Sequence, residues 1–270
     1  MPEKSITSLQ NPRVKDAVRL RSARHRGKQH RLLIDGAREI GRAIHAGISP
    51  VEAFVCPSLC TSVDSRHAVG LLEKSGCQVW NVTEDVFAKL AFGERHDGVL
   101  VVAHTPQVTL ADLKPRGVGP IAVIEGVEKP GNVGAILRSA DAAGVAAVIV
   151  ADPATDLYNP NCIRASLGAI FTIPVCTATS AAAGAWLRQR GTRMFAARVD
   201  ASLDYTAADL SGEVAIILGS EAEGLSPHWN ADDVTAVRLP MRGAVDSLNV
   251  SATAAILFYE AQRRRDGHGV

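Results

Sequence analysis

The stretch Leu239-Pro-Met-Arg-Gly-Ala-Val-Asp-Ser-Leu-Asn-Val-Ser-Ala-Thr-Ala-Ala255 contains the clearest structural signals in the chain. An apolar segment typical of a strand stops at Pro240, and a short glycine-containing loop follows. From Ser247 onward, apolar residues recur with helical spacing as far as Arg265. Ser and Asn side chains at a helix start cap free backbone N–H groups, and one of them would be enough. The surplus of polar residues predicts a ligand-binding loop between a strand and a helix, with Ser247 as the helix cap.

The residues before this stretch alternate between apolar strands and helices. Strands are predicted at 121–125, 145–150, 170–175, 193–197, 213–218 and 234–239, and helices at 132–143, 162–167, 181–190 and 247–264. Uniformly apolar strands between helices are typical of a parallel sheet that is covered on both faces. The C-terminal half is therefore predicted to be an α/β domain with a parallel sheet.

The first part of the chain predicts a second, smaller α/β unit. Strands are expected at 31–35, 51–56, 78–82 and 98–103, and helices at 36–46, 64–75 and 83–90, after a polar, basic and partly helical segment over residues 1–30. A stretch rich in Pro and Gly, without a clear period, separates the two parts. The predicted domains are therefore 1–104 and 119–270, joined by a linker at 105–118.

Composition narrows the class of protein. Hydrophobic residues make up 47% of the 270 positions, which is enough for a substantial core in each domain. The five cysteines form no C-x-x-C pair and no Cys/His set with zinc-like spacing, so no metal site is predicted and a reducing cytoplasm is expected. The sequence contains neither a secretory signal pattern nor an apolar run long enough to cross a bilayer, which predicts a soluble cytoplasmic protein.

The net charge of +1 predicts no partner, but the charges are unevenly distributed. Between Arg13 and Arg31 there are eight Lys or Arg residues and a single acid, Asp16. A cluster of this density is typical of a surface that binds nucleic acid, and it is equally compatible with a solvated helix face. If the segment binds RNA, the side chains expected to contact phosphates are Arg13, Arg19, Arg24, Arg26 and Lys28.

Ligands of parallel α/β sheets collect beyond the carboxyl ends of the strands, where this chain has three polar loops. The first loop runs from Glu125 to Gly134 and leads into a helix that carries Arg138, with Asn132 as a candidate cap. It lacks both the ending of a P-loop and a G-x-G-x-x-G pattern, and its glycines alone fit an ordinary strand-to-helix turn. The planar guanidinium of Arg138, however, suits phosphate binding.

The second loop is Ile217-Leu-Gly-Ser-Glu-Ala-Glu-Gly-Leu225, and the third lies in the stretch quoted at the outset. An acid at a strand end can bind a ribose hydroxyl, hold an arginine or cap a helix, so each of these roles is open to Glu221. Upstream of the second loop, Arg164 lies just before a predicted strand. It is either a surface residue or a second phosphate contact.

In this order, the three loops resemble those of the SpoU (TrmH-like) family of RNA ribose 2′-O-methyltransferases, in the SPOUT superfamily. The matching segments are Pro130-Gly-Asn-Val-Gly134 with Arg138, Leu218 to Ser226, and Leu239-Pro-Met241 with Asp246-Ser-Leu-Asn-Val-Ser251. The resemblance extends over residues 119–265. The N-terminal half looks like the family's smaller substrate-binding domain, of ribosomal L30e-like fold, on the basis of Leu32-Leu-Ile-Asp-Gly36 and the domain order. One departure is Lys129, where many members carry an acid.

The resemblance implies S-adenosylmethionine as methyl donor, a homodimer, and a trefoil knot in the C-terminal domain. It also implies the cofactor-binding residues, which are Ala197, Leu218, Gly219, Leu239, Met241 and Leu248. The methyl acceptor would be a ribose 2′-hydroxyl, so the expected partner is RNA rather than DNA. Large-subunit (23S) rRNA is the expected substrate, and tRNA is the alternative within the same class.

The resemblance also assigns catalytic roles. Arg138 is the candidate activator of the hydroxyl, but a guanidinium holds its proton too strongly to act as a plain base. Its expected role is to bind the adjacent phosphate and stabilise the developing alkoxide. Asn132 and Asn249 would orient Arg138 and the loops. Glu221 would position Arg138 or a ribose hydroxyl, and Ser247 would line the site.

Two functions from other classes are weighed against this one. A catalytically silent RNA-binding protein would not need the full set of polar residues at the three loops, and here the set is intact. A nucleotide-dependent oxidoreductase would be expected to carry a dinucleotide-binding fingerprint, which the sequence lacks.

Overall fold

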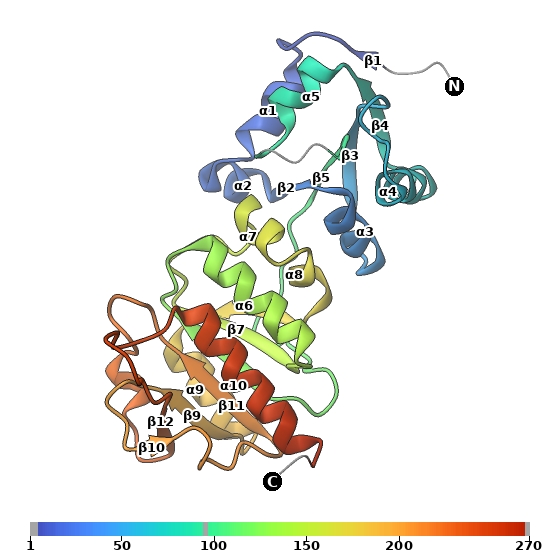
Figure 1. Cartoon of the computed structure of the whole chain (residues 1–270). Helices are drawn as coiled ribbons and strands as arrows, with labels where there is room; N and C mark the ends of the chain where they lie inside the picture. The colour runs from blue at the N-terminus through green and yellow to red at the C-terminus, as the bar shows by residue number, and fades with distance from the viewer. Residues whose placement is uncertain (1–4, 94–96, 268–270) are drawn as a thin grey trace. The chain divides into compact units, whose positions relative to one another are not determined.

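The computed structural model describes residues 5–93 and 97–267, which fold into two compact units (Figure 1). The first unit comprises Met1–Gln107 together with Tyr158–Thr172, and the second comprises Val108–Leu157 together with Ile173–Val270. Residues 105–120, which include the predicted linker, contain no helix or strand. Within the described ranges, no helix combines the length and the apolar character needed to span a membrane.

The first unit contains a five-stranded mixed sheet in the order β1-β4-β3-β5-β2. β5 runs antiparallel to both β2 and β3, whereas the other neighbours are parallel. The strands are β1 (Ser5–Ile6), β2 (Arg31–Asp35), β3 (Pro50–Val55), β4 (Gln78–Val82) and β5 (Val99–His104). The helices are α1 (Pro12–Arg19), α2 (Ala23–Gln29), α3 (Ala37–His45), α4 (Val63–Lys74), α5 (Glu84–Leu90), α7 (Pro160–Ala165) and α8 (Ala169–Thr172).

Side-chain caps begin several of these helices. The Asn11 side chain accepts from the backbone N–H of Arg13 at the start of α1, and the Ser62 side chain does the same for Ser65 at the start of α4. The apolar faces of α1 and α5 then pack with the sheet around Phe54, Phe87 and neighbouring aliphatic residues. The small α/β unit predicted for this half is confirmed, with the two-residue strand β1 as an addition. The unit also includes α7 and α8, in a segment (Tyr158–Thr172) that the sequence assigned to the C-terminal domain.

The second unit contains a seven-stranded sheet in the order β10-β12-β9-β11-β6-β7-β8. Its strands are β6 (Ile121–Glu125), β7 (Ala147–Ala151), β8 (Val175–Ala178), β9 (Arg193–Ala197), β10 (Leu203–Asp204), β11 (Val214–Leu218) and β12 (Val234–Arg238). Its helices are α6 (Pro130–Ala142), α9 (Ser180–Gln189), the short 3-10 helix η1 (Pro227–Trp229) and α10 (Val250–Arg265). Every pair of neighbouring strands is parallel, as predicted for this half.

Helices cover both faces of the parallel sheet, which explains its uniformly apolar strands. Ala183 and Leu187 of α9 pack against alternate residues of the central strands, such as Val123 and Ile149. α6 and α10 lie side by side on the opposite face (Figure 1). The parallel arrangement brings the carboxyl ends of all the strands to one edge of the sheet.

The predicted strand at 170–175 is wrong. Residues Ala169–Thr172 form helix α8, and the strand β8 begins only at Val175. The buried hydroxyl of Ser166 accepts from the backbone N–H of Gly168, 3.2 Å away, and thereby supports the start of this helical turn. Pro174 then separates the turn from the strand. Local capping and proline therefore override the strand propensity of an apolar run.

Candidate functional site

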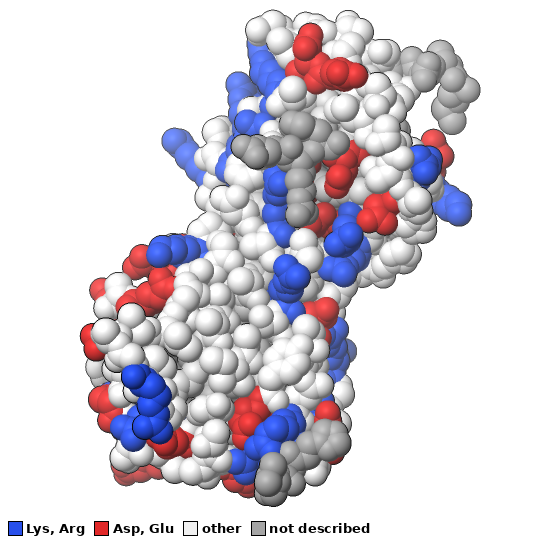
Figure 2. All heavy atoms as spheres, viewed as in Figure 1, with Lys and Arg blue, Asp and Glu red and all other residues white. Residues whose placement is uncertain are grey.

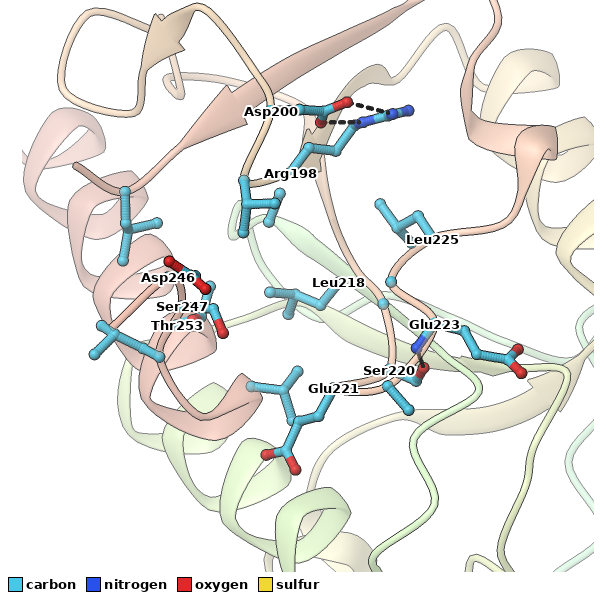
Figure 3. Close-up of a pocket in the computed structure, with 18 of the residues that line it drawn as sticks. Arg198, Asp200, Leu218, Ser220, Glu221, Glu223, Leu225, Asp246, Ser247 and Thr253 are labelled. Atoms are coloured by element: carbon cyan, nitrogen blue, oxygen red, sulfur yellow. Dashed lines mark hydrogen bonds and ion pairs between the residues drawn. The ribbon is translucent and has the colours of Figure 1, made fainter. Parts of the chain in front are cut away.

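A pocket of about 530 Å³ lies beyond the carboxyl ends of three neighbouring strands of the second unit, β9, β11 and β12 (Figure 3). One wall consists of residues 218–225, after β11. The opposite wall consists of residues 246–248 with Thr253 of α10. Residues 197–200 at the end of β9 also line the pocket, together with Val237, Leu239, Met241 and Val250. The volume falls in the range of sites for small molecules.

The wall after β11, here called the 218–226 loop (Leu218–Ser226), is internally braced. The backbone groups of Ser220 and Gly224 form two reciprocal hydrogen bonds of 3.0 and 3.1 Å. The Ser220 hydroxyl also accepts from the N–H of Glu223 at 3.0 Å. A Cβ on Gly219 would lie 2.2 Å from the carbonyl oxygen of Gly224, so this position requires glycine. The loop is therefore a compact hook with little conformational freedom.

Glu221, at the tip of this hook, connects three segments that are distant in sequence. Its Oε1 accepts from Nδ2 of Asn132 at 3.0 Å and from Nδ2 of Asn249 at 2.5 Å, and its Oε2 pairs with Nζ of Lys129 at 3.2 Å. The carboxylate points toward α6 (Figure 3). The pKa of Glu221 is held below its usual value, first by Lys129 and further by a backbone N–H and by Asn132. The carboxylate therefore acts as an ionised hub for the three loops.

The two predicted helix caps are wrong. α6 begins at Pro130 after Lys129, so Asn132 lies within the helix and its side chain donates to Glu221 instead. α10 begins at Val250, and its cap is Asn249, whose Oδ1 accepts from the backbone N–H of Ser251 at 2.9 Å. Ser247 lies outside the helix and lines the pocket. Proline is favoured at the first helical position, so α6 begins at Pro130, two residues before the predicted start at Asn132.

Arg138 lies exposed on α6, eight residues after the start of the helix. Among the described residues it makes no hydrogen bond or ion pair. Asn132 and Asn249 contact Glu221 and, at 3.4 Å, one another. The structure thus joins Asn132, Glu221 and Asn249 in one cluster, places Glu221 and Ser247 in the pocket lining, and leaves Arg138 exposed.

All six residues predicted to bind the cofactor line the pocket, and they are Ala197, Leu218, Gly219, Leu239, Met241 and Leu248. Acidic side chains are also present in the lining. Asp200 is held by two hydrogen bonds of 3.0 Å from Arg198, which lower its pKa, and Asp246 stands on the opposite wall (Figure 3). The combination of apolar side chains, strand-end backbone and carboxylates suits an adenosine-containing ligand that carries positive charge.

The predicted RNA-contacting side chains differ in their surroundings within the first unit. Arg24 and Lys28 are exposed on α2, and Figure 2 shows a group of Lys and Arg side chains over α1 and α2. Arg19 pairs with Asp16 at 2.9 Å. Arg13 bonds to Glu52 at 3.0 Å and lies over the ring of Trp80.

Arg26 is an exception to the predicted set, since it is only 4% exposed. Its Nη1 donates to the carbonyl oxygens of Leu20 at 2.7 Å and Arg21 at 2.8 Å, so it ties α2 to the end of α1. The prediction that Arg26 contacts phosphate is therefore not supported by its position. A basic residue on a short helix is expected at the surface. Arg26 is buried instead, because free carbonyl groups at the end of α1 accept hydrogen bonds from its guanidinium.

Arg164, on α7 of the first unit, is partly buried. Its guanidinium lies close to Gly93, where a Cβ would come within 2.5 Å of Nη1. Burial raises the pKa of the nearby Asp35 to about 6, against the opposing effects of a hydrogen bond from the Phe92 N–H and of the charge of Arg164. Arg164 thus faces a carboxylate in the unit that also carries the basic segment.

The sequence did not indicate a role for Glu125. The last residue of β6 is only 6% exposed, and its carboxylate accepts hydrogen bonds from Ser180, Ser226 and Trp229. The sequence feature that could have indicated a role is an acidic residue at the end of an otherwise apolar buried strand, because a buried carboxylate must find hydrogen-bond donors inside the protein.

Two family models match this chain. One, described as the SpoU rRNA Methylase family, matches residues 119–259. The other, described as an MRM3-like substrate binding domain, matches residues 11–101. Together the two models cover most of the two units described above.

Individual proteins with similar sequences and structures were also found. The chain is 28% identical over 256 residues to the 23S rRNA (guanosine(2553)-2′-O)-methyltransferase RlmP of Bacillus subtilis, across 95% of this chain and 98% of that protein. It is 41% identical to a crystal structure of an RNA 2′-O ribose methyltransferase, with a TM-score of 0.85 across 96% and 98% of the two chains. An AdoMet-bound rRNA methyltransferase from Sinorhizobium meliloti is 28% identical, with a TM-score of 0.86 across 96% and 97%.

Proposed function

Because this chain belongs to the SpoU rRNA methylase family, we propose that it transfers a methyl group from S-adenosylmethionine to a ribose 2′-hydroxyl of 23S rRNA. One observation carries the proposal. Two of the three polar loops line a single pocket, and Glu221 in its wall bonds to Asn132 of the first loop and to Asn249. The names of the similar proteins support rRNA as the substrate class.

The pocket fits S-adenosylmethionine. Leu218, Leu239 and Leu248 provide apolar contact for an adenosine, and the strand-end backbone provides hydrogen-bonding groups. Asp246 provides negative charge on the wall opposite the 218–226 loop. When bound, S-adenosylmethionine supplies an already activated methyl group, so the protein's task is to position the acceptor oxygen and to favour its deprotonation.

Arg138 is the residue proposed to act on the acceptor. Its exposed guanidinium is available for the phosphate next to the target ribose, and a positive charge there stabilises the alkoxide that develops on the 2′-oxygen. A guanidinium stays protonated at neutral pH, so Arg138 acts as an electrostatic stabiliser and not as a proton acceptor.

Glu221, Asn132 and Asn249 are proposed to act together as a positioning group. Glu221 is bonded to Asn132, Asn249 and Lys129, so it holds the pocket wall against the starts of α6 and α10. This arrangement supports a positioning role for the carboxylate. Arg138 is then presented on a helix whose first turn is fixed to the pocket.

The first unit is proposed to bind the RNA. We assign residues 1–104 to the substrate-binding domain, 105–118 to the linker and 119–270 to the methyltransferase domain, apart from the segment Tyr158–Thr172, which belongs to the first unit. Exposed cations on α1 and α2, Arg24 and Lys28 among them, support an electrostatic contact with phosphates. Arg164 is proposed as a further phosphate contact, because the Tyr158–Thr172 segment that carries it packs within the first unit.

We further infer a trefoil knot in the second unit, a homodimer and a cytoplasmic location. The support for all three is membership of the SpoU family and the rRNA substrate proposed above. Sedimentation equilibrium measures the oligomeric state directly. A monomer at micromolar concentration would contradict the dimer and leave the proposed chemistry untouched.

Transfer of tritium from labelled S-adenosylmethionine to total RNA tests the function, with rRNA and tRNA separated afterwards. Label in large-subunit rRNA is expected. Label confined to tRNA would retain the chemistry and overturn the substrate. If no fraction is labelled, whether naked RNA or precursor ribosomal particles are supplied, the proposed activity is refuted.

A further inference from the structure

Glu125 occupies an unusual place for a charged residue. It ends β6, an interior strand of the parallel sheet, and is 6% exposed, and its carboxylate accepts four hydrogen bonds. Oε1 accepts from the hydroxyls of Ser180 and Ser226 (the latter at 2.8 Å) and from Nε1 of Trp229 at 3.1 Å. Oε2 accepts from the backbone N–H of Ser226 at 2.8 Å.

The four donors come from two segments with different roles. Ser180 begins α9, whose N-terminal end carries partial positive charge that favours a nearby anion. Ser226 ends the 218–226 loop, and Trp229 lies in η1 immediately after it. The carboxylate of Glu125 therefore ties the end of the 218–226 loop to an interior strand of the sheet.

The start of the loop is already fixed by the sheet. Leu218 is the last residue of β11, which pairs with β6, so Leu218 and Glu125 end neighbouring strands. Without Glu125, the braced hook between Ser220 and Gly224 would be anchored at its start by β11 and at its tip by exposed contacts of Glu221. Its far end would have no polar anchor inside the sheet, and the wall formed by residues 219–225 could rotate.

We infer that Glu125 is a positioning residue for cofactor binding, which holds the 218–226 loop in its pocket-forming orientation from beneath. The inference rests on the proposed function, because it identifies the pocket as the site for S-adenosylmethionine. Four donors converge on the two oxygens, so an amide cannot replace the carboxylate. One half of an amide is itself a donor, and it would leave at least one buried N–H or O–H without an acceptor.

The test compares Glu125→Gln with Glu260→Gln. Glu260 is a matched control because it is also a buried carboxylate of the second unit, 8% exposed, whose partners Arg263 and Arg264 lie on α10 and outside the pocket lining. Calorimetry measures S-adenosylmethionine binding to the full chain without RNA. We expect the dissociation constant to rise by about tenfold or more in Glu125→Gln, as for loss of one to several buried hydrogen bonds. It should change by less than about twofold in Glu260→Gln.

Two further readouts separate positioning from general stability. Hydrogen exchange should accelerate at the amides of Ser220 and Gly224 in Glu125→Gln, well below its melting temperature, and remain slow in Glu260→Gln. In Glu125→Gln, the turnover rate at saturating S-adenosylmethionine should approach the wild-type kcat, while KM for S-adenosylmethionine stays above the wild-type value. If Glu125→Gln does not fold, Ser226→Ala and Trp229→Phe each remove one donor and should raise the dissociation constant by smaller factors.

Unchanged cofactor affinity and unchanged loop exchange in Glu125→Gln, or in both milder variants, would overturn the inference even if the melting temperature fell. Failure of the unaltered protein to bind S-adenosylmethionine would be a different result. It would refute the proposed function together with the role assigned to Glu125.

Discussion

Two carboxylates hold the 218–226 loop, one beneath it and one at its tip, in opposite surroundings. Glu125 is buried and accepts only from neutral donors, whereas Glu221 lies near the surface and pairs with the ammonium of Lys129. Loss of a buried acceptor with several donors is costly in free energy, because the donors are left unpaired. An exposed ion pair contributes little to stability and is screened by salt. On the proposed roles, Glu125 fixes the pocket wall from inside the sheet, whereas Glu221 holds its tip through exposed contacts that can adjust.

Arg138→Ala tests the exposed face and should have the largest effect on turnover. Loss of a cation that stabilises the developing alkoxide is expected to lower kcat by about 100-fold or more. The dissociation constant for S-adenosylmethionine should stay within about twofold, because Arg138 does not line the pocket. Single-turnover methylation and calorimetry measure the two quantities. Arg188→Ala, which removes an arginine on α9, is the control, and strong residual methylation by Arg138→Ala would contradict the assignment.

Gly219→Ala tests the interior of the loop. The added Cβ would lie 2.2 Å from the Gly224 carbonyl oxygen, so the hook must open or shift. Cofactor affinity should fall by about tenfold, which corresponds to a cost of about 1.4 kcal/mol. Gly131→Ala is the matched control, since no heavy atom lies within 4 Å of the position that its Cβ would take on α6, and alanine favours a helix. Equal affinities for the two variants would show that the loop tolerates movement.

The double variant Arg24→Ala/Lys28→Ala tests the basic face of the first unit. If both side chains contact phosphates, RNA affinity should fall several-fold, and the slope of its logarithm against log salt should decrease by about 2. The melting temperature should not change, because both residues are exposed. Arg26→Ala should instead lower the melting temperature, because two hydrogen bonds to carbonyl groups are lost, and should leave the salt slope of RNA binding unchanged. An unchanged salt slope in the double variant would identify the segment as a solvated face.

Glu221→Gln tests the tip of the loop and should have the smallest effect. The pKa of Glu221 is depressed in the folded state, so its stabilising contribution is present above the unfolded-state pKa and is lost as pH falls through the lower folded-state value. Wild type and variant should therefore differ in thermal stability by a constant, small amount at neutral pH and converge in acid. Added salt should shrink the difference. A difference that grew with acidification would contradict the ion-pair role.

The sequence predicted the parallel sheet because its strands are uniformly apolar. A strand that is buried on both faces requires apolar residues at consecutive positions, since neither set of alternate side chains meets water. The resemblance of the three loops predicted the pocket lining from Ala197 to Leu248. Predictions failed where a short-range contact decided the outcome. Ser166 and Pro174 convert an apolar run into a helical turn, and Pro130 starts α6 before Asn132.

Hydrophobic periodicity and glycine spacing by themselves determined most helices and strands and the position of the polar loops at strand ends, since both depend on neighbours within one element. They did not determine that Tyr158–Thr172 packs with the first unit. Tertiary structure alone decided which side chains meet. Glu221 accepts from Asn132, 89 residues away, and Glu125 accepts from donors in segments 55 and more residues away. A buried polar atom must find a partner wherever the fold brings one, and that partner is set by packing in space and not by distance along the chain.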